Sequence, residues 1–143
     1  MNDMKILLPL DNSPQAKRTV KNLLAMKDKF QNCTLTLLHV FVMEKIDYRG
    51  IPEMHFEMIE EKARKAAKRF LEEQKKVFVE AGLKTEILIQ DGHPRKTICA
   101  LADSGDYDLL IISRHTEGEF RNLLFGYVSN YVIHRVKNPV LIL

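Results

Sequence analysis

Residues 108–143 read DLLIISRHTEGEFRNLLFGYVSNYVIHRVKNPVLIL. This stretch indicates a buried strand at residues 108–113, a long loop rich in charge and glycine, a helix over residues 126–136 and a final apolar strand at residues 140–143. A helix that opens on glycine after such a loop presents free backbone N–H groups, which favour an anion. The segment therefore predicts an α/β protein with a phosphate-binding corner near this end.

The rest of the chain continues the same alternation. Apolar runs at residues 4–10, 34–40 and 85–90 predict three further strands. Helical spacing of apolar residues follows Pro14, occupies residues 53–81 and follows Pro94. Strands that alternate with helices build a parallel sheet with helices on both faces. We predict one α/β domain over residues 1–143, with an open, doubly wound, five-stranded parallel sheet of order 3-2-1-4-5.

Each predicted helix carries an apolar stripe that we expect to be buried. The first helix is expected to be capped by Asn12 or Ser13. Its stripe consists of Ala16, Val20, Leu23 and Leu24. The stripe of the long helix consists of Ile59, Ala63, Ala66, Ala67, Phe70, Val77 and Phe78. After Pro94 the buried side is expected to comprise Ile98, Ala100 and Leu101.

The bulk properties exclude several classes of protein. A net charge of +3 is only mildly basic, so we expect no nucleic acid partner. The first residues, MNDMKILLPLDN, hold an apolar run too short for a signal peptide or a membrane span. Cys33 and Cys99 lie in apolar segments without a CxxC partner, which is typical of buried thiols in a reducing compartment. We therefore expect a cytoplasmic protein that has no membrane partner.

Neither a catalytic nor a metal-ligating pattern is found in the sequence. The five histidines are scattered and form no HxxxH pair, and GxSxG is absent. We assign no catalytic residue and no metal ligand, and expect no enzyme activity. His39 lies in an apolar run and is expected to be a hydrogen-bonded core histidine, whereas His115 is the histidine expected to face a ligand.

The predicted topology places a candidate site. In a doubly wound sheet, ligands bind beyond the carboxyl ends of the strands, where the strand order reverses. With the order 3-2-1-4-5 this point lies between the first and fourth strands. Residues 9–13 and 113–126 meet there, so Asp11 and residues 126–129 are candidates. Asp11 could instead cap the first helix.

Four passages also carry a resemblance. They are KILLPLDNS, TLTLLHV, QDGHPRKTICALADSGDYDLLIIS and LLFGYVSNYVIHRVKNPVLIL. In their order and spacing they resemble the universal stress protein family along essentially the whole chain. ATP-binding members of that family carry a Gly-x2-Gly-x9-Gly-(Ser/Thr) pattern, in which glycines let the backbone close on the phosphates. Here these positions hold Ser113, Thr116, Gly126 and Tyr127, so only the third glycine is retained.

The departures from the pattern differ in how strongly we expect them to weaken phosphate binding. Thr116 is β-branched and resists a left-handed backbone, and the ring of Tyr127 is too long to replace a serine. Glu117 and Glu119 add negative charge to the loop. Other residues of the loop favour phosphate binding. Three side chains could supply positive charge: Arg114, His115 and Arg121. Gly118 could restore the turn in a shifted register.

The resemblance implies that the adenosine half of the site is better preserved. Asp11, Pro9, Leu10 and Val40 match positions around the adenosine, and Ser129 matches a hydroxyl beside the phosphates. The candidate nucleotide-binding residues are Pro9, Leu10, Asp11, Val40, Ser113, Arg114, Thr116, Gly126, Tyr127, Val128 and Ser129.

An apolar strand at a sheet edge is an aggregation hazard unless it is covered. We therefore expect a homodimer paired through the segment that starts at Pro139 and ends at Leu143, and family members commonly dimerise in this way. The motif losses favour a dimeric stress-response or regulatory module with weak or absent ATP binding. The alternatives are an ATP- or AMP-binding switch, a weak ATPase, or a protein that keeps only the adenosine half and binds AMP or another adenine ligand.

Overall fold

The computed structural model describes residues 3–42, 53–114 and 127–143. Its elements in chain order are β1 (Met4–Pro9), α1 (Pro14–Ala25), the 3-10 helix η1 (Lys27–Phe30), β2 (Cys33–Phe41), α2 (Glu53–Glu80), β3 (Lys84–Asp91), α3 (Pro94–Ala102), β4 (Leu109–Ile112), α4 (Tyr127–Arg135) and β5 (Val140–Ile142). The predicted strands and helices are present, with ends shifted by one or two residues. Gly126, the predicted start of the last helix, lies outside the described residues.

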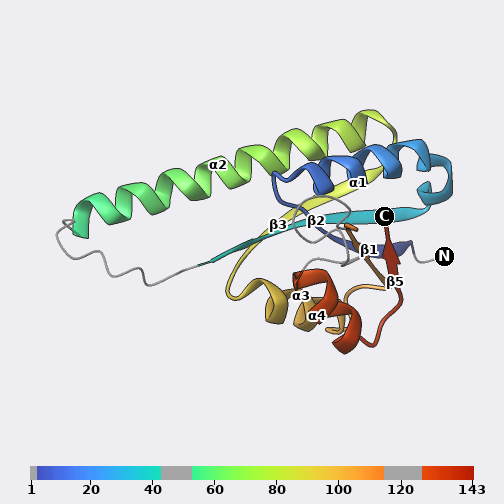
Figure 1. Cartoon of the computed structure of the whole chain (residues 1–143). Coiled ribbons are helices and arrows are strands. Elements are labelled where there is room, and N and C mark those ends of the chain that lie inside the picture. Colours follow the sequence, from blue (N-terminus) through green and yellow to red (C-terminus); the bar gives the residue numbers. More distant parts are fainter. Residues whose placement is uncertain (1–2, 43–52, 115–126) are drawn as a thin grey trace.

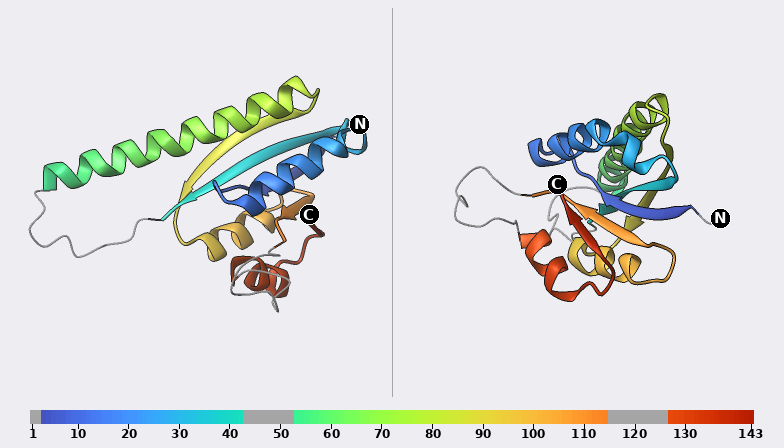
Figure 2. Two further views of the ribbon diagram at one scale, coloured as in Figure 1. Left: turned by 45° about the horizontal axis from the view of Figure 1, so that its top comes forward. Right: turned by 90° about the vertical axis from the view of Figure 1, so that its right-hand side faces the viewer.

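The five strands form one parallel sheet of order β3-β2-β1-β4-β5, as predicted. Helices α1 and α2 cover one face, and α3 and α4 cover the other (Figures 1 and 2). Chain connections run outward from β1 in both directions. The strand order therefore reverses between β1 and β4.

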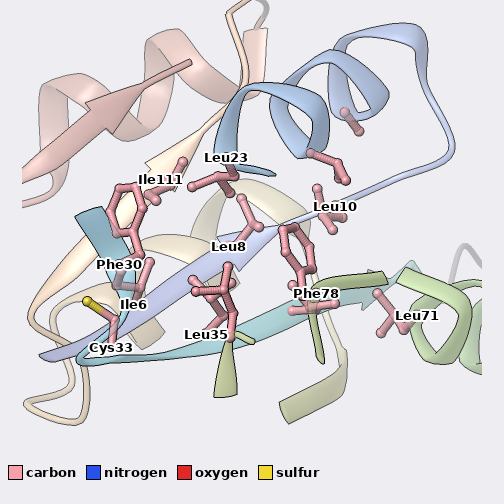
Figure 3. Packing of buried hydrophobic residues seen from close by; sticks show 14 residues of the cluster. Ile6, Leu8, Leu10, Leu23, Phe30, Cys33, Leu35, Leu71, Phe78 and Ile111 are labelled. Carbon is pink, nitrogen blue, oxygen red and sulfur yellow. The ribbon is translucent and has the colours of Figure 1, made fainter. Parts of the chain in front are cut away.

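The core has two halves because side chains alternate along each strand. Ile6 and Leu8 of β1 point to the face under α1 and α2, where they pack with Leu35 and Phe78 (Figure 3). Leu7 points to the opposite face and packs with residues of α3 and α4. All five side chains are completely buried. Coverage of both faces explains why the strands read as nearly continuous apolar runs.

Helix α1 begins as the sequence predicts. The backbone N–H of Ala16 donates to the Ser13 hydroxyl at 3.1 Å, so Ser13 is the cap among the two candidates. Pro14 occupies the first turn, where no backbone donor is required. The helix buries Ala16, Val20 and Leu23 against the sheet, which confirms most of its predicted stripe.

Helix α2 departs from the prediction in its first half. Ile59 is 52% exposed, and Ala63 and Ala66 are also exposed, because this part of α2 extends beyond the sheet (Figure 1). Burial begins with Leu71, which the predicted stripe omits, and continues at Phe78. Two other residues predicted to be buried, Val77 of α2 and Ala100 of α3, are likewise exposed.

An arginine clamp joins α2 to the ends of β2 and β3. The Arg64 guanidinium donates to both carboxylate oxygens of Asp91, at 2.7 and 3.0 Å, and to Glu60 at 3.1 Å. It also lies over the ring of Phe41, 4.4 Å from its centroid. The hydrogen bond from Arg64 holds the pKa of Asp91 below its usual value. The clamp therefore fixes the carboxyl ends of β2 and β3 against α2.

A second polar cluster positions β5. The carboxylate of Asp103 accepts the backbone N–H groups of Lys137 and Asn138 at 3.1 Å. The side-chain amide of Asn138 donates to the carbonyl oxygens of Ala102 and Tyr107, at 2.6 and 2.9 Å. The turn between α4 and β5 is thus fastened to the end of α3, which sets where the edge strand begins.

Replacing Gly92 with alanine is expected to destabilise the turn between β3 and α3 by about 1–3 kcal/mol or more. Gly92 has a φ of +146°, and a Cβ there would approach Thr97 Oγ1 to 2.6 Å. Gly105 has a φ of +98° with open space around the same position, so Gly105→Ala controls for backbone strain alone. Urea denaturation should show a larger loss for Gly92→Ala, and Thr97→Ala should relieve part of it. Equal losses for the two glycine variants would contradict the contact.

Candidate functional site

A cavity of about 480 Å³ lies at the point where the strand order reverses. It opens beyond the carboxyl ends of β1, β2 and β4 and is bordered by α1, α3 and α4. The described residues that line it are Pro9, Leu10, Asp11, Ser13, Gln15, Ala16, Leu38, His39, Val40, Pro94, Ile98, Ile112, Ser113, Val128 and Ser129. This volume is within the range of small-molecule sites, about 300–1,000 Å³.

The lining combines a broad apolar wall with a small set of polar groups. Leucine, isoleucine, valine and proline side chains form the wall. The polar groups are one carboxylate, one imidazole, one amide and three hydroxyls; they belong to Asp11, His39, Gln15, Ser13, Ser113 and Ser129. A largely apolar ligand with a few hydrogen-bonding groups fits such a surface.

Most of the predicted site residues meet in this cavity. Those that line it are Pro9, Leu10, Asp11, Val40, Ser113, Val128 and Ser129. Arg114 is described but does not line it. Thr116, Gly126 and the candidates His115 and Arg121 lie outside the described residues, as does the side chain of Tyr127, which opens α4. The geometry therefore brings the predicted adenosine-side residues together, whereas much of the predicted phosphate loop is not described.

Asp11 lies two residues before Ser13, the residue that caps α1, and does not itself cap the helix. Its Oδ1 accepts the backbone N–H of Ser13 at 3.1 Å, which stabilises the turn into α1. It also lines the cavity and is exposed. Its Oδ2 makes no hydrogen bond to any of the described residues and is open to solvent or to a ligand donor.

The exit from β4 is held by several hydrogen bonds. The Thr19 hydroxyl of α1 lies 2.6 Å from the Ser113 hydroxyl, and the Ser129 hydroxyl donates to the Ser113 carbonyl at 3.1 Å. The backbone N–H of Arg114 donates to the Leu143 carbonyl at 2.8 Å. The guanidinium of Arg18 donates to the Arg114 carbonyl. These bonds join α1, β4, α4 and the end of the edge strand.

Ser113 occupies the first glycine position of the family pattern without backbone strain. Among the described residues, a positive φ occurs only at Gly82, Gly92 and Gly105. A serine can therefore adopt the backbone found at residue 113. The loss of this glycine alone does not distort the end of β4.

Ser13 belongs to the loop of residues 9–13 that was predicted to border the site. Several other lining residues were not predicted from the sequence: Gln15, Ala16, Leu38, His39, Pro94, Ile98 and Ile112. The prediction that His39 is a core histidine is wrong, because its ring is half-buried and borders the cavity. It lies 6.5 Å from the ring of Phe41, near the arginine clamp. Pro14 and Pro94 could have indicated some of these residues. Each proline marks the start of a helix that follows a parallel strand, and such helix starts lie at the carboxyl end of the sheet, where the cavity opens.

The remaining chemistry of the described residues is limited. Burial raises the pKa of the thiols of Cys33 and Cys99, which keeps them protonated and weakly nucleophilic. Cys33 is buried as predicted, whereas Cys99 is only half-buried. Within residues 3–42, 53–114 and 127–143, no three His, Cys, Asp or Glu side chains cluster in a way that could hold a metal. Over the same residues, every helix is too short or too polar to cross a membrane.

Comparisons with known proteins agree with this architecture. Universal stress protein MJ0577 from Methanocaldococcus jannaschii is 28% identical, covering 96% of this chain and 93% of that protein. Its solved structure matches with a TM-score of 0.80, covering 100% of this chain and 96% of that one. Universal stress protein Sll1388 from Synechocystis is 27% identical, with 96% of each chain covered.

A more distant structure shares the fold. The universal stress protein from Archaeoglobus fulgidus, solved in complex with dAMP, is 20% identical with a TM-score of 0.65, covering 99% of this chain and 98% of that one. The sequence also matches the Universal stress protein family over residues 4–143. This match spans nearly the whole chain, and the chain therefore belongs to the universal stress protein family.

Proposed function

We propose that this chain is a homodimeric stress-response or regulatory module that binds an adenine nucleotide chiefly through its nucleoside part. In this proposal ATP binds weakly or not at all, because the polyphosphate lacks an effective glycine loop. The chain acts by binding rather than by catalysis and works in the cytoplasm. The main support is the cavity at the reversal point, where Pro9, Leu10, Asp11 and Val40 lie together against an apolar wall.

Three further observations support a nucleoside or monophosphate ligand rather than a triphosphate. The Ser129 hydroxyl, which matches a phosphate-side position of the family, already donates to the Ser113 carbonyl. Arg114, the one described cation of the predicted phosphate loop, does not line the cavity. The related Archaeoglobus fulgidus protein was solved with dAMP, a ligand with a single phosphate. These features favour a monophosphate or nucleoside ligand over ATP.

The affinities of adenosine, AMP and magnesium ATP, measured by isothermal titration calorimetry, test this function. We expect AMP to bind and ATP to bind no more tightly than AMP, because the two extra phosphates gain no additional donors. ATP that binds tenfold or more tightly than AMP would favour the switch or weak ATPase instead. Absence of binding for all three ligands would contradict the nucleotide part of the proposal.

A matched pair of variants locates the binding. Val128 lines the cavity on α4 and is 38% exposed, so a glutamate is tolerated there. Val128→Glu places a carboxylate beside the ligand and is expected to weaken AMP binding by about fivefold or more. Asn130→Glu adds the same charge at an exposed position of the same helix that does not line the cavity, and should leave the affinity unchanged. Equal effects of the two variants would place the ligand elsewhere.

The proposed dimer uses β5. Among the described residues, this strand pairs with β4 alone, and its three side chains are half-buried. An apolar edge strand with one free side is a surface that a second copy can cover by continuing the sheet. The same segment, from Pro139 to Leu143, therefore supplies the proposed interface.

A further inference from the structure

A buried hydroxyl on α1 supports one of the hydroxyls that line the cavity. Thr19 is completely buried, and its Oγ1 lies 2.6 Å from the Oγ of Ser113. This distance is at the short end of O–H···O hydrogen bonds, about 2.5–3.0 Å. Thr19 itself does not line the cavity, whereas Ser113 does. Two residues that hydrogen-bond to Thr19 do line the cavity, Gln15, bonded through its carbonyl, and Ser113, bonded through its hydroxyl, and the contact with Ser113 is the shorter.

The direction of the hydrogen bond between Thr19 and Ser113 decides whether Ser113 presents a hydrogen-bond donor to the cavity. The Thr19 hydroxyl has one proton and three acceptors: Ser113 Oγ at 2.6 Å, the Gln15 carbonyl at 3.1 Å and the Leu143 carbonyl at 3.3 Å. Ser113 Oγ is the nearest acceptor. When Thr19 donates to it, the proton of Ser113 is not needed inside the protein and is available to the cavity. A hydroxyl that accepts one hydrogen bond is also a stronger donor in the next.

The backbone around Ser113 keeps this hydroxyl in place. Its carbonyl accepts from the Ser129 hydroxyl at 3.1 Å. The next residue, Arg114, donates its N–H to the Leu143 carbonyl at 2.8 Å. The position of Ser113 Oγ is therefore set by α1, α4 and β5 together. Such support from surrounding groups is what holds a ligand-binding side chain in a productive geometry.

We propose that Thr19 is a positioning residue, which directs the Ser113 O–H into the cavity as a donor to a ligand oxygen. The ligand oxygen is a ribose hydroxyl or a monophosphate oxygen. The inference rests on the proposed nucleotide binding and adds the residue that tunes it. Threonine and serine hydroxyls form a two-step relay in which the buried member orients the exposed one.

Four variants test the relay by calorimetry with adenosine and AMP as probes. Thr19→Val keeps the shape and removes the hydroxyl, and is expected to weaken AMP binding about 3- to 10-fold. Ser113→Ala should show the same loss, and the double variant should lose no more than Ser113→Ala alone, because Thr19 acts through Ser113 in the proposed relay. Thr19→Ser restores the hydroxyl and should bind within about twofold of the natural protein.

The outcomes separate the proposals. A loss for adenosine as well as AMP assigns the accepting oxygen to the ribose, and a loss for AMP alone assigns it to the phosphate. If the natural protein binds AMP, and Thr19→Val and Ser113→Ala bind it as tightly as the natural protein does, the relay is overturned. The proposed function is unaffected by that result. Losses that multiply in the double variant also overturn it. No binding by the natural protein overturns both. If Thr19→Val does not fold, unchanged AMP affinity in Ser113→Ala is sufficient to reject the relay.

Discussion

Replacing Phe78 with alanine is expected to lower the free energy of unfolding by about 3–5 kcal/mol, because a large buried ring leaves a cavity that the surroundings fill only in part. Phe78 is completely buried and belongs to the cluster that includes Leu35, Leu71 and Leu8 (Figure 3). With Leu71, it is one of the two completely buried side chains by which α2 packs on the sheet. Urea denaturation followed by circular dichroism measures the change.

The neighbouring Val79 supplies the control. Its side chain is 50% exposed, so Val79→Ala changes the same helix without removing core contacts. We expect a change of about 0.5 kcal/mol or less for that variant. A loss below about 1 kcal/mol for Phe78→Ala would contradict the proposed role of Phe78 in attaching α2.

Replacing Ile142 with proline is expected to convert the proposed homodimer into a monomer. Within β5, the Pro139 carbonyl and the Leu143 N–H bond to β4, so residues 139, 141 and 143 direct their backbone groups inward. Backbone groups in a strand alternate in direction, and the N–H of Ile142 therefore faces the free side. Proline removes that donor, and edge strands tolerate proline where the N–H faces outward. Light scattering after gel filtration should show the mass of one chain.

Ile142→Ala is the matched control for the dimer. It removes more of the side chain than proline does but keeps the outward N–H, so we expect it to remain dimeric at the concentration where Ile142→Pro is monomeric. Circular dichroism checks that both variants keep their fold. A dimer that persists in folded Ile142→Pro would place the interface elsewhere, and a monomeric natural protein would reject the dimer itself.

The approximate element bounds could be predicted from the sequence because they depend on local signals, whereas the strand order is a non-local property that general rules of topology only narrow. Alternation of apolar runs with amphipathic segments permits few topologies once connections are short and right-handed. The buried residues of α2 could not be predicted in the same way. Ile59 continues the helical period that includes Phe78, but periodicity does not reveal where the sheet beneath a helix ends. Only the length of the strands decides that.

The location of the candidate site was predicted from the sequence, but only some of the residues that line it were. Asp11, Val40 and Ser129 follow from topology and family resemblance. His39 was misassigned because an apolar strand looks the same along its length, whereas the helices cover only part of it. Thr19 had no sequence signal at all: a threonine on a helix face reveals its hydrogen-bonding partner only when Ser113, far along the chain, is brought next to it.

The position of β1 between β2 and β4 has a consequence for how the cavity is assembled during folding. Pairing of β1 with β2 closes a short stretch of chain, from Met4 to Cys33, whereas the contact of Lys5 with Asp108 joins residues 103 positions apart. Closing the longer loop costs more chain entropy. The cavity is lined both by residues from 9–40 and by residues from 94–113 and 128–129. It therefore does not exist until β4 has paired with β1. A ligand that fits it can stabilise only the finished sheet, and none of the partly folded forms that precede it.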